Sequence, residues 1–114
     1  MDKQQRRQIA SDYKKRMQQG GVYAIRCTQN GKSLLLSTAD MVGSLNRYDF
    51  SQMTGGCLHP KMRDDWAKFG AAAFVFEIVE TLTQQETQTD ADFHKEIGEL
   101  LDMLTSQISP EALY

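Results

Sequence analysis

Two cysteines and two histidines are the residues of this sequence whose types first suggest metal chemistry. Cys57 and His59 stand two positions apart and Cys27 precedes them, which resembles the beginning of a metal-ligand pattern. A structural zinc site, however, usually takes four ligands from pairs such as C-x-x-C or H-x-x-x-H, and the sequence contains neither pair. We therefore predict no zinc site and interpret both cysteines as free thiols with a packing role.

Charge is distributed unevenly along the chain. Residues 1–68 carry twelve Lys and Arg against six Asp and Glu, whereas residues 69–114 carry one against nine, so the net charge of −2 hides a basic front and an acidic tail. This asymmetry is typical of a polyanion partner, of a second copy of the chain, or of pairing between the two halves. Two solvated faces explain it equally well.

The composition is that of one ordinary globular domain. A chain of 114 residues fits a single core, and 40% hydrophobic with 25% charged residues excludes the disordered and fibrous classes. No apolar run approaches the roughly 18–20 residues that span a bilayer, and no apolar stretch follows the polar segment Met1–Arg7. We therefore predict a cytoplasmic protein with no membrane partner and no secretory signal.

Hydrophobic periodicity and turn residues predict the elements that must position any site. In chain order they are a basic helix over residues 3–18, strands over 22–27 and 33–37, helices over 40–53 and 60–69, a strand over 74–80 and a helix over 89–106. This order, α-β-β-α-α-β-α, predicts an α+β domain with a small, mainly antiparallel three-stranded sheet flanked by helices. We expect one domain over 1–114, with a basic leading helix over 1–19, a core over 20–82 and an acidic C-terminal region over 83–114.

Local signals set the boundaries of these elements. Gly20-Gly21 is expected to end the first helix, and Asn30-Gly31 to form the hairpin turn, because these residues tolerate positive φ. Thr38 or Asp40 is expected to cap the next helix, and Gly55-Gly56 to end it. That helix is expected to bury one side, and the last helix a broad leucine stripe: Met41, Val42, Leu45 and Tyr48 in the first, Phe93, Ile97, Leu100, Leu101 and Leu104 in the second.

Two stretches of the sequence together resemble a known family. Gly21-Val22-Tyr23 resembles the first half of the GIY-YIG signature and leads through a hairpin, as in that family. The stretches Trp66–Gly70 and Phe74–Glu80 are similar to a block that many members share, W-x-K-Y-G followed by F-x-F-E-I-x-E. The resemblance covers about residues 20–82, and the family cleaves phosphodiester bonds, usually with one divalent metal such as Mg²⁺.

The resemblance implies a set of catalytic residues that this sequence keeps only in part. Tyr23 stands at the position of the first tyrosine, and Arg47 lies on the helix where an arginine would stabilise phosphate charge. The second half of the signature falls on Leu34-Leu35-Leu36, so a leucine replaces the second tyrosine and another the glycine. Glu96 and Glu99 are the alternatives for the metal-binding glutamate of the last helix.

Three functions remain open at this point. The first is a catalytically degenerate domain that binds nucleic acid, possible DNA contacts being Arg26, Lys32, Arg47, His59, Lys61, Arg63 and Lys68. The second is an active, Mg²⁺-dependent endonuclease with rearranged catalytic groups. The third is a protein-interaction module or homodimer that pairs through the leucine stripe of the C-terminal helix. Equally good interpretations make Tyr23 a packed strand aromatic, Arg47 a surface residue paired with Asp49 or Asp40, and His59 a helix cap.

Overall fold

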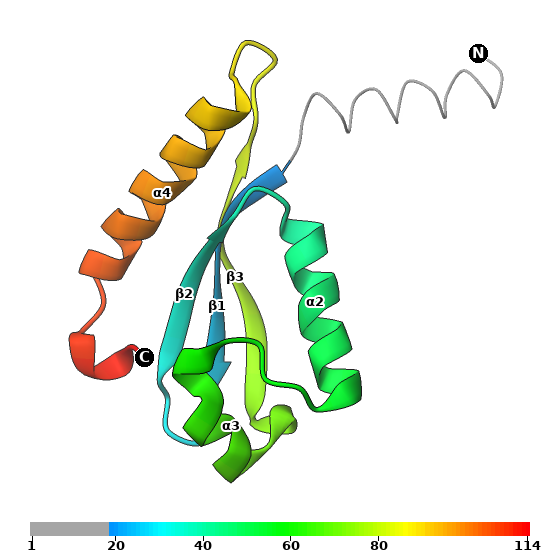
Figure 1. The fold of residues 1–114 in the computed structure, drawn as a ribbon. Helices are drawn as coiled ribbons and strands as arrows, with labels where there is room; N and C mark the ends of the chain where they lie inside the picture. Colours follow the sequence, from blue (N-terminus) through cyan, green and yellow to red (C-terminus); the bar gives the residue numbers. More distant parts are fainter. Residues whose placement is uncertain (1–18) are drawn as a thin grey trace, which may run out of the picture.

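A computed structural model describes residues 19–114 as one three-stranded sheet between two layers of helices (Figure 1). The elements are β1 (Gln19–Cys27), β2 (Ser33–Thr38), α2 (Met41–Thr54), a 3-10 turn and α3 (Arg63–Phe69), β3 (Phe74–Thr83) and α4 (Asp90–Ser106). The predicted α+β class and element order are confirmed; the predicted helix over 3–18 lies outside the described residues. Among the helices of residues 19–114, none is long and apolar enough to cross a membrane.

β1 is the central strand of the sheet, and its alternation places two sets of side chains on opposite faces. The strand order is β2-β1-β3, and both neighbours run antiparallel to β1. Ile25 and Cys27 pack with Trp66 and the α2–α3 layer, whereas Val22 and Ala24 pack under α4. Every β1 residue from Val22 to Cys27 except Tyr23 and Arg26 is buried.

The glycine pair that was predicted to end a helix lies inside β1, which begins at Gln19 and not at residue 22 as predicted. The end of the predicted helix lies outside the described residues. Gly21 has φ +134°. A Cβ at Gly20 would overlap the backbone of Thr38 and Ala39, and one at Gly21 the backbone oxygen of Glu80. The glycines therefore allow both neighbouring strands to approach β1 closely. The β1–β3 register also shifts between Val22 and Tyr23, so β3 carries one extra residue beside Tyr23.

The caps of α2 are those the sequence predicts, but its buried side is not. Asp40 caps the helix by accepting from the Gly43 amide at 3.0 Å, and Gly55 ends it at φ 77°. Met41 is buried as expected, whereas Val42 and Leu45 are exposed. The buried polar positions are serines: the Ser44 hydroxyl donates to Thr38 at the end of β2, and the Ser51 hydroxyl donates to the Gly56 carbonyl after α2.

α4 covers the other face of the sheet, and its leucine stripe is used there. Phe93 and Ile97 are 1% and 2% exposed, and Leu100, Leu101 and Leu104 pack against the β1–β2 residues of that face. Thr89 caps the helix by accepting from the Asp92 amide at 3.1 Å, as predicted from the sequence. Because the stripe packs inside the fold, it does not provide the partner surface that the sequence suggested.

The last residues of the chain join the hairpin to α3. Tyr114 donates a hydrogen bond from its hydroxyl to Asp65 at 2.6 Å and one from its amide to the Ser33 carbonyl at 3.0 Å. Asn30 of the turn donates to the same carboxylate at 2.7 Å. The Tyr114 hydrogen bond in particular lowers the pKa of Asp65, and burial, followed by the Asp65 contact, raises the pKa of Tyr114.

Replacing Gly21 with Ala should destabilise the domain by about 2 kcal/mol or more, because the new Cβ would meet the Glu80 backbone at a φ that alanine rarely adopts. Gly98→Ala is the matched control. Gly98 lies inside α4 with no atom within 4 Å of a built Cβ, so alanine should stabilise by about 0.5–1 kcal/mol. Urea unfolding of both variants tests this, and equal effects would contradict the close approach at β1.

Tyr114→Phe should lower the melting temperature at neutral pH, because it removes the hydroxyl that donates to ionised Asp65. Asp65 has a lower pKa in the folded protein than its ordinary value of about 3.9, so its contribution is present above that pH and is lost as pH falls through the folded pKa. The difference in melting temperature between wild type and variant should therefore shrink below about pH 4. A difference independent of pH would contradict an ionised acceptor.

Candidate functional site

A small cavity lies between the sheet and α2, where the sequence places Tyr23 and Arg47. Its volume is about 90 Å³. β1, β2, α2 and the loop after α2 supply the walls: Tyr23, Ile25, Leu36, Ser44, Arg47, Tyr48 and Leu58. The structure thus brings together the first-motif tyrosine, the helix arginine and the last leucine of the second motif. Among residues 19–114, no carboxylate and no imidazole lines this cavity.

Arg47 is held at this cavity by a chain of hydrogen bonds that ends in β2. Its Nη2 donates to the Ser44 hydroxyl at 3.0 Å, and that hydroxyl donates to the Thr38 hydroxyl at 2.9 Å. Thr38 in turn exchanges hydrogen bonds with the backbone of Asp40 at 3.0 Å. Within residues 19–114 no carboxylate forms an ion pair with Arg47, so the predicted pairing with Asp49 or Asp40 is absent there. The guanidinium is oriented yet keeps donors for a ligand.

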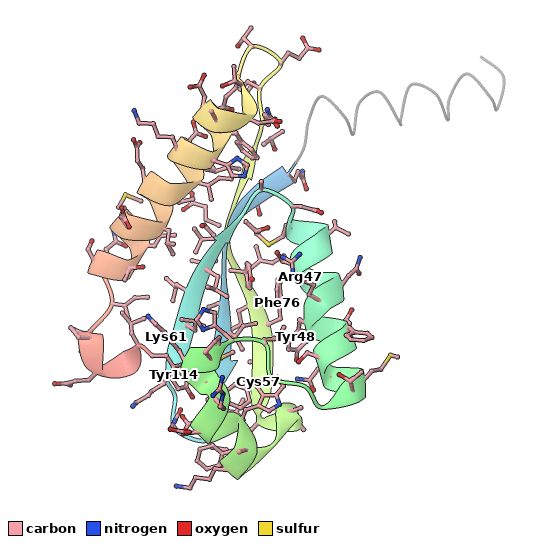
Figure 2. The ribbon with its side chains drawn as sticks, in the orientation of Figure 1. Arg47, Tyr48, Cys57, Lys61, Phe76 and Tyr114 are labelled. Carbon is pink, nitrogen blue, oxygen red and sulfur yellow. The ribbon has the colours of Figure 1, made fainter. Side chains whose placement is uncertain are left out.

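Two tyrosines flank the cavity, and one aromatic ring of β3 connects them. Tyr23 stacks on Phe76 with ring centroids 4.8 Å apart, and Tyr48 packs against the same ring at 5.6 Å. Figure 2 shows Tyr48 of α2 beside Phe76. The Tyr48 hydroxyl donates to the Phe74 carbonyl at 2.8 Å, and burial, followed by the charge of Asp49, raises its pKa. The sequence predicts Tyr48 only as a residue of the buried side of its helix, because its place at the cavity depends on this packing between elements.

The side chains of the three leucines at the expected second motif lie in three different environments. Leu34 is buried among the side chains of Ile25, Met62 and Trp66, and Leu35 lies on the opposite face under α4. Leu36, which is directly opposite Tyr23 in the β1–β2 register, is the leucine that lines the cavity. The position of the second tyrosine is therefore part of the core, and the position of the glycine carries an apolar side chain beside Tyr23.

The two candidate metal ligands lie on α4, which covers the face of the sheet opposite α2 (Figure 1). Glu96 accepts a hydrogen bond from Gln88 at 3.3 Å, and Glu99 is exposed. Neither glutamate joins Tyr23 and Arg47 at the cavity. In the part of the chain that the structure describes, no three His, Cys, Asp or Glu side chains gather as a metal-binding group. These residues do not fit a Mg²⁺ ion at the cavity, and no reaction step is assigned to one.

The basic residues predicted to contact nucleic acid are spread over the molecule. Arg26 forms an ion pair with Glu77 at 2.5 Å, on the opposite face from Tyr23. Lys32 and Lys68 lie near Asp65, at the end of the domain that holds Tyr114. Their charges lower the pKa of Asp65 further, after the hydrogen bond from Tyr114.

Three more basic residues follow α2: His59 and Lys61 precede α3, and Arg63 is its first residue. His59 is a helix cap, as one interpretation of the sequence expected, because its Nδ1 accepts from the Lys61 amide at 3.2 Å. Lys61 and Arg63 are exposed. Of the predicted basic residues, Arg47 alone lines the cavity.

A larger hollow adjoins the small cavity and shares Arg47 and Leu58 with it. This α2 hollow has a volume of about 420 Å³ and lies between α2 and the segment that follows it. Its walls include Asn46, Arg47, Phe50, Thr54, Cys57 and Leu58. Cys57 is exposed there, so its predicted packing role is wrong, whereas Cys27 is fully buried as predicted; both are free thiols.

The fold was compared with known proteins. No protein-family model and no curated protein matches the sequence. Among solved structures, the catalytic domain of homing endonuclease I-TevI matches with a TM-score of 0.57 and 23% identity over 83% of this chain and 95% of that chain. A mutant of the catalytic domain of intron endonuclease I-TevI matches with a TM-score of 0.55 and 20% identity over 78% and 82%.

These similarities define a class. The chain has the fold of a GIY-YIG nuclease catalytic domain, and the resemblance inferred from Gly21–Tyr23 and from the Trp66–Glu80 block is confirmed at that level. At 20–23% identity the similarity establishes the fold alone, so the chemistry depends on the residues at the cavity.

Ser44→Ala should cost about 1 kcal/mol of stability and loosen Arg47, because the hydroxyl both accepts from Arg47 and donates to Thr38. Ser37→Ala is the matched control, since Ser37 is exposed and should change stability by less than about 0.5 kcal/mol. Thermal unfolding gives the first effect, and NMR relaxation of the Arg47 Nε–H group gives the second. An unchanged Arg47 order parameter would contradict the positioning role of Ser44.

Proposed function

We propose that this chain is a nuclease-like domain that binds nucleic acid through Arg47 and cleaves it inefficiently or not at all. The observation that carries the proposal is the state of Arg47: exposed, oriented by Ser44, and without an acidic partner among residues 19–114. A guanidinium in this state offers several donors to a phosphate oxygen pair. The fold, which matches a nuclease catalytic domain, supports a nucleic acid as the source of that phosphate.

The composition of the cavity argues against efficient cleavage. Phosphodiester hydrolysis requires a group that removes a proton from the nucleophile and a group that stabilises the developing charge. Arg47 supplies the second. For the first, the cavity offers only hydroxyl groups: Tyr23, Ser44 and Tyr48. The hydroxyls of Ser44 and Tyr48 already donate to Thr38 and to the Phe74 carbonyl. A neutral tyrosine hydroxyl, such as that of Tyr23, is a poor base.

The structure does not favour the alternative of a protein-interaction module. It rested on the leucine stripe of α4, which packs against the sheet. The two free thiols, Cys27 and Cys57, are those of a protein in a reducing compartment, and we propose a cytoplasmic location on that basis.

Arg47→Ala should weaken binding of a short DNA oligonucleotide about 10-fold at low salt, because it removes charge-assisted hydrogen bonds to phosphate. Arg26→Ala is the control: it removes the same charge from the opposite face, where Glu77 already neutralises it, and should change affinity less than about twofold. Fluorescence anisotropy over a salt series measures both, with wild-type affinity falling as salt rises. Absence of wild-type binding at low salt, or an equal loss in Arg26→Ala, would refute the proposal.

Cleavage is tested separately with supercoiled plasmid, excess protein and either Mg²⁺ or Mn²⁺. We expect no nicking above the protein-free control. Nicking that disappears in Tyr23→Phe and in Arg47→Ala would instead establish the active endonuclease and show that the cavity works with rearranged groups.

A further inference from the structure

The α2 hollow contains an aromatic ring and an amide that have no role in the proposed phosphate contact. Arg47 marks the boundary between the small cavity and the hollow and lines both. On the side of the hollow, Phe50 is 65% exposed, so its ring is accessible to a ligand in the hollow. Asn46, one residue before Arg47, adds an amide that both donates and accepts hydrogen bonds.

The far wall of the hollow is fixed by hydrogen bonds to side chains. The Ser51 hydroxyl donates to the Gly56 carbonyl, and the Trp66 indole donates to the Gly55 carbonyl at 2.9 Å. Because Ser51 and Trp66 are both buried, the segment that carries Cys57 and Leu58 is anchored to α2 and to α3. The hollow is therefore formed before any ligand binds, which reduces the entropy cost of binding.

We infer that the α2 hollow binds the base of an unpaired nucleotide while Arg47 holds its phosphate, so that the domain prefers single-stranded over double-stranded nucleic acid. The inference rests on the proposed function, because it assigns the nucleic-acid form that the same arginine contacts. Phe50 supplies a flat apolar face for stacking, and Asn46 an amide for the base edge. The volume of 420 Å³ lies at the lower end of the range for small-molecule sites, about 300–1,000 Å³.

Charge favours a nucleic acid over a protein segment as the occupant. The part of the chain that the structure describes lines the hollow with Arg47 and with no acidic residue, so the charge of the hollow complements a phosphate. Bases in a duplex are stacked and paired, and their faces are inaccessible to Phe50 unless the base leaves the stack, which costs free energy. An unpaired strand presents the same groups without that cost.

The test compares binding of a labelled oligothymidylate of about 12 nucleotides with binding of a duplex of equal length, by anisotropy at low salt. Phe50→Ala should weaken single-strand binding roughly 5- to 100-fold, the range expected for loss of one stacked base, and change duplex binding much less. Phe50→Trp should keep single-strand affinity close to that of the wild type, because the indole ring also provides a stacking surface.

Met53→Ala is the matched control. Met53 is 83% exposed on the same helix but does not line the hollow, and its removal should change single-strand affinity less than about twofold. Equal losses in Phe50→Ala and Met53→Ala would overturn the inference and indicate a general apolar docking face, such as a protein partner would use. Thermal unfolding of each variant excludes a folding defect, which is not expected at exposed positions.

The outcomes also separate this inference from the proposed function. If Arg47→Ala weakens both nucleic acids and Phe50→Ala weakens neither, the phosphate contact stands and the base-binding hollow is refuted. If Arg47→Ala changes neither, the proposed function itself fails.

Discussion

Everything in this domain depends on β1 being covered on both of its faces while it pairs on both of its edges. A strand in this position cannot place a polar side chain freely, because one face belongs to the α2–α3 layer and the other to α4. Gly20 and Gly21 allow the backbones of β2 and β3 to close around it. Tyr23 is the first β1 side chain after the glycines that is only half-buried. It lines the small cavity between the sheet and α2.

The cavity combines a cation that is oriented by a hydrogen bond with apolar surroundings. Arg47 is oriented through Ser44 and Thr38, so its position is coupled to the end of β2 as well as to its own helix. Leu36 and Leu58 supply apolar walls of the cavity beside it. These features suit the proposed binding of a phosphate better than cleavage of a phosphodiester bond. Under the proposed function, the hollow beside the cavity would extend this surface from a phosphate contact to a base contact.

Local sequence signals predicted the elements well because their causes are local. Asn30-Gly31, the caps at Asp40 and Thr89, and the stop at Gly55 each act through the backbone of a few neighbouring residues.

The buried side of α2 could not be predicted in the same way. Periodicity favoured Val42 and Leu45, whereas the structure buries Ser44 and Ser51, whose hydroxyls are satisfied by Thr38 and by Gly56 from other segments. The face that α4 covers is likewise a property of topology, so no pattern within α4 could tell whether Glu96 would reach Arg47. The exposure of Phe50 depends on the same tertiary packing.

The difference between the two thiols gives the protein a built-in chemical reporter. Cys27 is sealed in the core, whereas Cys57 lies open on the wall of the α2 hollow. An alkylating reagent therefore reaches one position in the folded molecule, and that position borders the surface where a ligand is expected. A ligand in the hollow should slow the alkylation of Cys57. The alkylation rate with and without a ligand therefore measures occupancy of the hollow in the unmodified sequence.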